Sequence, residues 1–235
     1  MTLKNDKKEC GYSEVNGISM YYEIYGSGSI PLVLIHGGGS TIQTSFDAIL
    51  PFLSAFRQVI AVELQAHGRT GDRPHPVTFE QDADDVAGLL RNLDIPKASF
   101  LGFSNGGSTA MQIAIRHPAM VHKLIPISAV TKREGLIPGF FEFMATASLD
   151  NMPMPLQIAY REVAPDPECL QIMHDKDRDR MIHFTDWPDE DLRSISAPTL
   201  LIVGDRDVIT VSHTLEMTRL IPDATLMVLP GVHGA

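Results

Sequence analysis

The stretch that decides the fold is residues 99–106, which read SFLGFSNG. A compact, mostly apolar run from Ser99 to Phe103 ends in the pattern G-x-S-x-G, and a helical pattern follows from about Asn105 to Arg116. A turn from strand to helix at one residue forces that residue into a strained backbone conformation, and flanking glycines leave room for the close approach. We therefore expect Ser104 to stand exposed at the end of a buried strand.

Five further compact apolar runs occur along the chain, and helical patterns recur between them. The runs span residues 32–35, 59–62, 124–127, 200–203 and 226–229. Uninterrupted runs of this kind suit strands that are buried on both faces. The segment from Thr78 to Leu93 begins with an N-cap candidate and carries apolar residues at helical spacing. Strands alternating with helices predict an α/β fold, with a mostly parallel sheet and helices on both faces.

The N-terminal part of the chain follows a different pattern. Asn16-Gly17 lies between a short extended stretch and the alternating residues Met20, Tyr22 and Ile24. Asn-Gly between such stretches is a strong signal for a two-residue hairpin turn. We expect an antiparallel hairpin over residues 12–25, ahead of the parallel sheet.

The alternation of strands and helices stops between about residues 131 and 190. No clear strand occurs there, and prolines separate several helical segments. The segment is rich in large apolar side chains, which we expect mostly to pack against the sheet domain and partly to line a pocket. We predict a core domain of residues 1–130 and 191–235, interrupted by a helical insertion of residues 131–190.

Composition and charge exclude several classes of protein. The 235 residues carry a net charge of −10, which repels polyanions and makes nucleic acid a poor partner. The two cysteines, Cys10 and Cys169, are too few for a disulfide framework and fit a reducing compartment. Residues 1–10 are too polar for a secretory signal, and the apolar runs are too short to span a bilayer. We expect a cytoplasmic protein that does not bind membranes.

A glycine-rich segment, His36-Gly37-Gly38-Gly39, follows the strand predicted at residues 32–35. Glycine lets the backbone approach a substrate oxygen closely. The amides of Gly38 and of Asn105, at the start of a helix, are therefore candidates for an oxyanion hole. A plain glycine-rich turn and a phosphate-binding loop are the alternatives. The segment completes no G-x-G-x-x-G and lacks the lysine of a nucleotide-phosphate loop.

Two more loops at strand ends supply a candidate acid and a candidate base. Gly204-Asp205-Arg206-Asp207 follows the run at residues 200–203, and His233 follows the run at residues 226–229. The order Ser104, Asp207, His233 is one of the known chain orders for a nucleophile, an acid and a base. Asp205 is the neighbouring alternative for the acid. The sequence thus predicts a catalytic site of a serine, an aspartate and a histidine.

Together these motifs resemble the α/β-hydrolase family over about residues 12–233. The resemblance rests on the glycine-rich loop after His36, the turn at Ser104, the Gly204-x-x-Asp207 loop and His233. The acid of that family usually occupies the last position of G-x-x-D, so the resemblance favours Asp207 as the acid. It also implies that the helical insertion is a cap domain.

Two features depart from the pattern of that family. Residues 63–70 read ELQAHGRT, where many relatives carry D-x-x-G-H-G-x-S. The sequence also stops at Ala235, two residues after His233, where relatives usually continue into a closing helix. Without such a helix we expect an exposed apolar sheet face, which invites association and makes a homo-oligomer a candidate assembly.

The whole constellation predicts a serine hydrolase that cleaves an ester, thioester or related acyl bond of a small, apolar molecule through an acyl-enzyme. Such a reaction needs no cofactor. Carbon–carbon bond hydrolysis and cofactor-free haloperoxidation are alternatives within the fold, and a small-molecule receptor or partner-binding protein with a slow hydrolase pocket is another. Asp175, Asp177 and Asp179 mimic a calcium loop, but Arg180 occupies the position of its glycine, so we expect no metal there.

Overall fold

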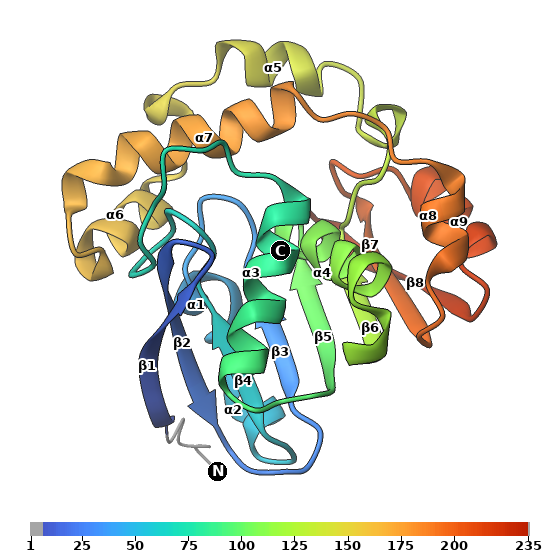
Figure 1. The fold of residues 1–235 in the computed structure, drawn as a ribbon. Coiled ribbons are helices and arrows are strands. Elements are labelled where there is room, and N and C mark those ends of the chain that lie inside the picture. The colour runs from blue at the N-terminus through green and yellow to red at the C-terminus, as the bar shows by residue number, and fades with distance from the viewer. Residues whose placement is uncertain (1–6, 235) are drawn as a thin grey trace.

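A computed structural model describes residues 7–234. Residues 1–6 and 235, which belong to the expected core domain and to the polar N-terminal stretch, lie outside the described residues. An eight-stranded sheet with the order β1-β2-β4-β3-β5-β6-β7-β8 runs through the molecule (Figure 1). Its strands are β1 (Lys7–Val15), β2 (Ile18–Tyr25), β3 (Leu32–Ile35), β4 (Val59–Val62), β5 (Ala98–Phe103), β6 (Val121–Ile127), β7 (Thr199–Arg206) and β8 (Ala224–Val232).

The predicted hairpin at the N-terminus is confirmed. Strands β1 and β2 pair antiparallel, and the two residues between them, Asn16 and Gly17, both have positive φ, at 46° and 86°. Such a turn matches the twist of the two strands. Strand β2 also pairs antiparallel with β4, whereas every pairing from β4 to β8 is parallel. The expected mostly parallel α/β sheet is therefore present.

Helices cover both faces of the sheet. On one face, α3 (Phe79–Asn92), α4 (Asn105–Arg116) and α9 (Val211–Leu220) bury their apolar residues against the larger core cluster. The short helices α1 (Ile42–Phe46) and α2 (Leu50–Ser54) pack against the opposite face. Thr78 caps α3 as predicted, because its side chain accepts a hydrogen bond from Gln81 N.

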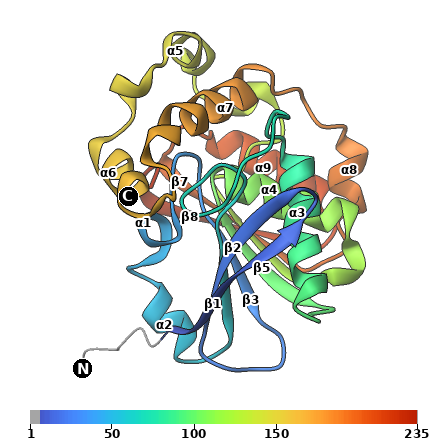
Figure 2. The ribbon, with the colours of Figure 1, turned by 60° about the vertical axis from the view of Figure 1, so that its left-hand side comes forward.

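The segment between β6 and β7 is helical. It holds α5 (Phe140–Thr146), α6 (Met154–Val163) and α7 (Leu170–Ile182), and α8 (Asp189–Ser194) leads back to the sheet. Helices α5, α6 and α7 lie over the end of the sheet to which the arrowheads of the parallel strands point (Figures 1 and 2). Four short 3-10 helices connect other elements of the described residues: η1 (Pro118–Met120), η2 (Arg133–Gly135), η3 (Leu149–Asn151) and η4 (Pro167–Cys169).

One expectation about burial is wrong. The run at residues 226–229 was expected to be buried on both faces, but β8 is an edge strand. Leu226 packs against the core beside α9, whereas Met227 and Leu229 are 42% and 46% exposed. An apolar run therefore does not reveal by itself whether a strand lies at the centre or at the edge of its sheet.

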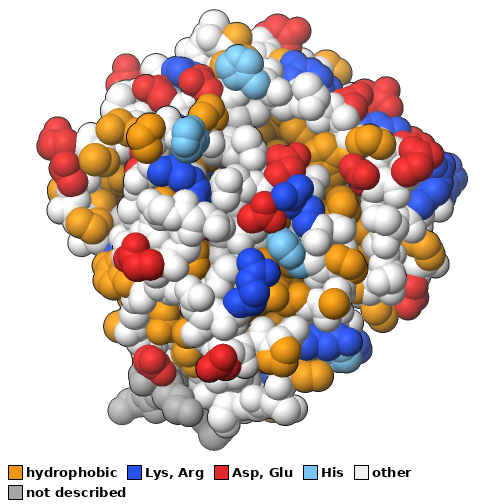
Figure 3. All heavy atoms as spheres, in the orientation of Figure 1, with side chains coloured by type: hydrophobic (Ala, Val, Ile, Leu, Met, Phe, Trp, Pro, Cys, Tyr) orange, Lys and Arg blue, Asp and Glu red, His pale blue; other side chains and the backbone are white. Residues whose placement is uncertain are grey.

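The distribution of surface charge and the lengths of the helices were compared with what binding to nucleic acid or to a membrane would require. On the face drawn in Figure 3, Lys and Arg side chains stand beside Asp and Glu and form no continuous basic surface. Within residues 7–234, none of the helices is both long enough and apolar enough to cross a bilayer.

Candidate active site

Ser104 occupies a tight turn between β5 and α4. Its φ of 53° lies in the left-handed region, which is costly for a residue with a side chain. The flanking positions admit only glycine. A Cβ added to Gly102 would lie 2.0 Å from the carbonyl oxygen of Gly106, and one added to Gly106 would lie 2.1 Å from that of Ile35. The turn therefore presents the Ser104 side chain at the carboxyl end of a buried strand, as the sequence predicts.

The structure brings the three expected side chains together from three separate loops. Ser104 Oγ lies 3.0 Å from Nε2 of His233. Nδ1 of the same ring lies 2.7 Å from Oδ1 of Asp207. The loops follow β5, β7 and β8, so the meeting point is the carboxyl end of the parallel sheet. These distances allow an unbroken hydrogen-bonded chain from hydroxyl to carboxylate.

Asp207 is held as a buried carboxylate. Its Oδ2 accepts a hydrogen bond of 2.5 Å from Ser128 Oγ, and its Oδ1 accepts from Ile209 N at 3.1 Å. Burial alone would raise the pKa of Asp207, but hydrogen bonds from His233, Ser128 and the Ile209 amide outweigh it and lower the pKa to about 2. An ionised carboxylate only accepts hydrogen bonds, so Nδ1 of His233 carries the proton and Nε2 can accept from Ser104.

The structure separates the two aspartates that were candidates for the acid. Asp205 points to the surface, where its side chain is 52% exposed and accepts a hydrogen bond from Gly231 N at 2.8 Å. Only Asp207 of the two touches His233. Asp205 thus helps to hold the β8 loop in place, away from the hydroxyl of Ser104.

The two candidate oxyanion donors lie beside each other. A Cβ added to Gly38 would lie 2.6 Å from Asn105 Nδ2 and 3.0 Å from Asp177 Oδ2, so the backbone at Gly38 is in close contact with both side chains. Gly38, Asn105, Ser104 and His233 all border one cavity. The glycine loop after β3 and the start of α4 therefore face the same space as the hydroxyl.

This cavity has a volume of about 310 Å³ and lies between the sheet end and the overlying helices. Its walls are mainly apolar, and many of the wall residues come from the helical insertion. They include Phe140, Phe143 and Met144 of α5, Leu156 of α6, and Met173 and Met181 of α7. Other large side chains of the insertion, such as Phe184 and Trp187, pack against Phe79 of α3 instead.

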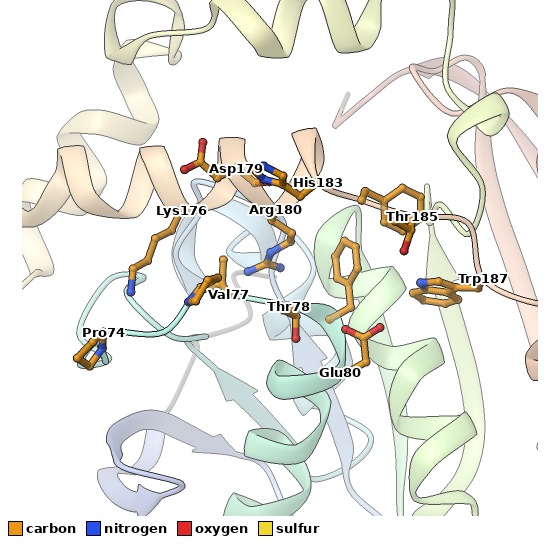
Figure 4. Close-up of a pocket in the computed structure, with 13 residues that line it drawn as sticks. Pro74, Val77, Thr78, Glu80, Lys176, Asp179, Arg180, His183, Thr185 and Trp187 are labelled. Atoms are coloured by element: carbon orange, nitrogen blue, oxygen red, sulfur yellow. The ribbon is translucent and has the colours of Figure 1, made fainter.

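A second cavity lies on the other side of α7, toward the loop at Pro74 and the start of α3 (Figure 4). It is larger, at about 610 Å³, but neither Ser104 nor His233 borders it. Its cations already have partners: Lys176 Nζ donates to Asp72 Oδ1 and to Arg73 O, both at 2.6 Å, and Arg180 pairs with an aspartate of α3. The candidate active site is therefore the space around Ser104 and His233, where the apolar cavity of about 310 Å³ meets a third cavity of about 700 Å³ that also borders both side chains.

Several residues at the site were missed by the sequence analysis. Ser128 follows β6 directly, and its place at a strand end is the signal that could have found it. Asp177 enters the sequence analysis only through the spacing of Asp175, Asp177 and Asp179, which resembles a calcium loop. In the structure α7 is continuous, and Asp177 turns inward, where Oδ2 lies 2.8 Å from His67 Nε2 and accepts from Gly39 N at 2.7 Å. No local pattern in the sequence predicts the contacts of Asp177 with His67 and Gly39.

The altered loop at residues 63–70 is well packed. Glu63 accepts hydrogen bonds from Arg69 N at 2.6 Å and from Arg69 Nη1 at 2.8 Å. Gly68 has a φ of 53°, and a Cβ there would lie 2.4 Å from the Glu63 carboxylate. Glutamate in place of the more common aspartate thus closes the loop onto itself and leaves His67 facing α7.

Comparisons with known proteins identify the family to which the chain belongs. The model of the alpha/beta hydrolase family matches residues 32–233. A 2-hydroxy-6-oxo-2,4-heptadienoate hydrolase of Pseudomonas putida is 28% identical over 235 residues, which cover 90% of this chain and 84% of that protein. The dihydrolipoyllysine-residue acetyltransferase component of an acetoin cleaving system, also from Pseudomonas putida, is 29% identical over 93% of this chain, which spans 62% of that longer protein.

A solved structure also shares the fold. Est816, described as an N-acyl homoserine lactone degrading enzyme, is 27% identical and has a TM-score of 0.74, with 95% of this chain and 93% of that one covered. The match to the family model covers most of the sequence and extends from β3 to His233. The chain therefore belongs to the alpha/beta hydrolase family and is a hydrolase of that type.

Proposed function

We propose that the chain is a serine hydrolase that cleaves an ester, thioester or related acyl bond of a small, apolar substrate through an acyl-enzyme. The observation that carries this proposal is the contact of Ser104 Oγ with His233 Nε2 at 3.0 Å, beside a mainly apolar cavity. Ser104, His233 and Asp207 are the nucleophile, the base and the acid. The amides of Gly38 and Asn105 are the oxyanion donors.

In the first half of the reaction, His233 Nε2 takes the hydroxyl proton while Ser104 Oγ attacks the carbonyl carbon. The carbonyl oxygen becomes an oxyanion and accepts hydrogen bonds from the two amides. Ionised Asp207 stabilises the imidazolium that forms on His233. His233 then gives the proton to the leaving alcohol or thiol, and the acyl group stays on Ser104.

In the second half, water replaces the leaving group. His233 takes a proton from the water as its oxygen attacks the acyl carbon, and the oxyanion forms again in the same place. Collapse of the intermediate returns the proton to Ser104 and releases a carboxylic acid. Side chains and backbone amides perform every step, so the proposed reaction uses no cofactor.

The cavities around Ser104 indicate the kind of substrate. Their volumes, about 310 and 700 Å³, lie within the roughly 300–1,000 Å³ that is usual for ligand pockets. Phe140, Phe143 and Met144 supply an apolar wall from α5. We expect apolar acyl groups to be preferred over acyl groups that carry a charge.

The test compares the turnover of p-nitrophenyl esters of increasing acyl length by the wild-type chain and by Ser104→Ala, and separate samples of both are labelled with a fluorophosphonate. We expect covalent label on Ser104 and a loss of roughly a million-fold in kcat in the variant. Ser194→Ala on the exposed helix α8 is the matched control and should keep full activity. Turnover that survives in Ser104→Ala would refute the proposal. A chain that takes up the label but turns over neither esters nor the carbon–carbon substrate described below would be a receptor with a slow pocket.

Hydrolysis of a carbon–carbon bond is the second candidate, and the similarity to the 2-hydroxy-6-oxo-2,4-heptadienoate hydrolase favours it. A 2-hydroxy-6-oxodienoate is coloured, so its cleavage is measured as loss of absorbance. Faster turnover of this compound than of any ester in the series would select this second function. Turnover of esters alone would exclude it.

A further inference from the structure

A second histidine–carboxylate pair joins the helical insertion to the glycine loop. Asp177 of α7 accepts a hydrogen bond from Gly39 N at 2.7 Å, although 138 residues separate the two in sequence. The same oxygen lies 2.8 Å from His67 Nε2, and both side chains are largely buried, at 2% and 13% exposure. A carboxylate that is withdrawn from water in this way forms strong hydrogen bonds with charged and backbone donors.

His36 fixes the direction of the Gly38 amide from the other side. Its Nε2 lies 3.0 Å from the Leu64 amide, which can only donate, so its Nδ1 carries the proton and donates to Gly37 O at 2.7 Å. Burial and the charge of the neighbouring His67 lower the pKa of His36 to about 3, which keeps it neutral. The carbonyl of Gly37 and the N–H of Gly38 belong to one planar peptide unit, so fixing the first orients the second.

The contacts of His67 favour a proton on both ring nitrogens, since each faces an oxygen acceptor, and Gly39 N lies 3.3 Å from Nε2 as well. Its Nδ1 lies 2.8 Å from Gln65 O, which can only accept, and its Nε2 faces an ionised oxygen of Asp177. Burial alone would lower the pKa of His67, but the charge and the hydrogen bond of Asp177 raise it above its ordinary value. For Asp177 the balance is the reverse. Burial would raise its pKa, but the charges of His67 and Arg180 hold it well below the usual range.

The charges around the pair are balanced. Arg180, also on α7, has Nη2 at 3.4 Å from Asp177 Oδ1 and Nη1 at 3.0 Å from Asp82 Oδ2 of α3. The rings of His36 and His67 lie 4.8 Å apart. Two cations and two carboxylates therefore share a buried cluster beside the active-site cavity, with neutral His36 between the cluster and the glycine loop.

We propose, building on the hydrolase function above, that Asp177 is a positioning residue that completes the oxyanion hole from the insertion. Gly38 lies between two peptide units, and each unit is held: the first through Gly37 O by His36, and the second through Gly39 N by Asp177. Three consecutive glycines leave this backbone otherwise free to rotate. The Gly38 amide therefore points at the developing oxyanion only while α7 keeps Asp177 in contact with the loop.

The experiment compares Asp177→Ala and Asp177→Asn with the control Asp179→Asn. Asp179 is two residues away on α7, is 50% exposed and borders the other cavity (Figure 4). We expect Asp177→Ala to lower kcat for a short p-nitrophenyl ester by about 10- to 100-fold, somewhat less than the removal of a donor itself, with KM nearly unchanged. Asp177→Asn keeps an oxygen that can accept from Gly39, so its loss should be smaller. Asp179→Asn should behave as wild type.

A transition-state mimic separates positioning from a general loss of structure. A trifluoromethyl ketone forms a tetrahedral oxyanion on Ser104, whereas the product carboxylic acid does not. Binding of the ketone should weaken in the same proportion as kcat, and binding of the product should stay unchanged. Wild-type kcat in both Asp177 variants, or equal weakening of the two ligands, would overturn the positioning role.

Nuclear magnetic resonance tests the contact of Asp177 with His67 and Gly39 independently of enzymatic turnover. In the wild-type chain both ring nitrogens of His67 should carry a proton at neutral pH. In Asp177→Asn the ring should carry only one proton. The amide signals of Gly38 and Gly39 should shift in Asp177→Asn and stay in place in Asp179→Asn; unmoved amides would overturn the inference. A chain without Ser104-dependent turnover would refute the proposed function instead, and these signals would still report on Asp177.

Discussion

Two of the histidine–aspartate pairs in residues 7–234 that have a side chain bordering the active-site cavity have nearly equal lengths but different surroundings. His233 and Asp207 lie 2.7 Å apart, and His67 and Asp177 lie 2.8 Å apart. The side chain of His233 is 28% exposed and its second nitrogen faces a hydroxyl. The side chain of His67 is 2% exposed, and its second nitrogen faces a backbone carbonyl.

We infer from this difference that the partner of the second nitrogen decides the role of such a pair. The Ser104 hydroxyl can donate a proton to His233, so that ring can gain and lose a proton during a reaction. The carbonyl of Gln65 can only accept, so both protons of His67 are committed to hydrogen bonds. The first pair is suited to proton transfer, and the second to holding a loop and a helix together.

The largest expected contrast comes from replacing each histidine in turn. His233→Gln removes the proposed base, and we expect kcat for a short p-nitrophenyl ester to fall by roughly a million-fold. His67→Gln removes the imidazole that contacts Asp177 behind the glycine loop, so the fall should be about 10- to 100-fold. Equal losses in the two variants would abolish the distinction between a reacting pair and a positioning pair.

The carboxylate of the reacting pair gives the next largest effect. Asp207→Asn removes the charge that stabilises the imidazolium, and we expect kcat to fall by about 10,000-fold. Asp205→Asn is the matched control, since Asp205 lies in the same loop and bonds only to the Gly231 amide and the neighbouring Arg206 among the contacts described. A control that loses as much activity as Asp207→Asn would place the acid at the wrong residue.

Ser128→Ala tests whether a neighbouring hydroxyl supports the pair of His233 and Asp207. The variant removes the hydrogen bond to Asp207 Oδ2, so the carboxylate is less firmly held and its pKa should rise. We expect kcat to fall by about tenfold, because hydrogen bonds to charged groups contribute roughly 1.5–3 kcal/mol. Fluorophosphonate labelling should slow by a similar factor. Unchanged rates would mean that Asp207 does not depend on this bond.

The pH dependence of stability should have opposite signs for the two pairs. The pKa of Asp207 is lowered from 3.8 to about 2, so its stabilisation is present above 3.8 and is lost as pH falls through about 2. The pKa of His67 is raised above 6.5, so its stabilisation is complete below 6.5 and is lost as pH rises through the higher value. Asp177, Arg180, Asp82 and His36 surround His67 and set that value.

Urea unfolding at several pH values measures both signs. The difference in the free energy of unfolding between wild type and Asp207→Asn should shrink between pH 4 and pH 2. The difference between wild type and His67→Gln should shrink on the alkaline side of pH 6.5. A His67 difference that grows with rising pH would contradict a charged imidazole in that cluster.

Much of the fold was predictable because it depends on local patterns. Strands β3 and β4 coincide with the apolar runs at residues 32–35 and 59–62, and α3 begins after the predicted cap at Thr78. The turn at Ser104 is encoded by the glycines on either side, which no other residue could replace. Parallel strands end at one edge of a sheet, so residues that follow them meet there even when they are far apart in sequence.

The direction in which the side chains of α7 point was harder to predict than the positions of the strands and turns. Asp175, Asp177 and Asp179 look alike in the sequence, but successive residues of a helix are about 100° apart. Asp175 and Asp179 therefore share one face and pair with Arg178, while Asp177 points the opposite way, into the molecule. The direction in which α7 turns that face depends on how it packs over the sheet. The exposure of β8 depends in the same way on its place in the strand order.

The amino-acid sequence by itself determined the order of the strands in the chain, the turn at Ser104 and the loops that carry Asp207 and His233, since short-range geometry specifies them. Only the tertiary structure decided that Asp207 rather than Asp205 contacts His233, that Ser128 supports it, and that Asp177 holds the glycine loop. The reason is physical. Each of these contacts joins segments that are distant in sequence, and no local pattern records which side chains meet once the segments pack.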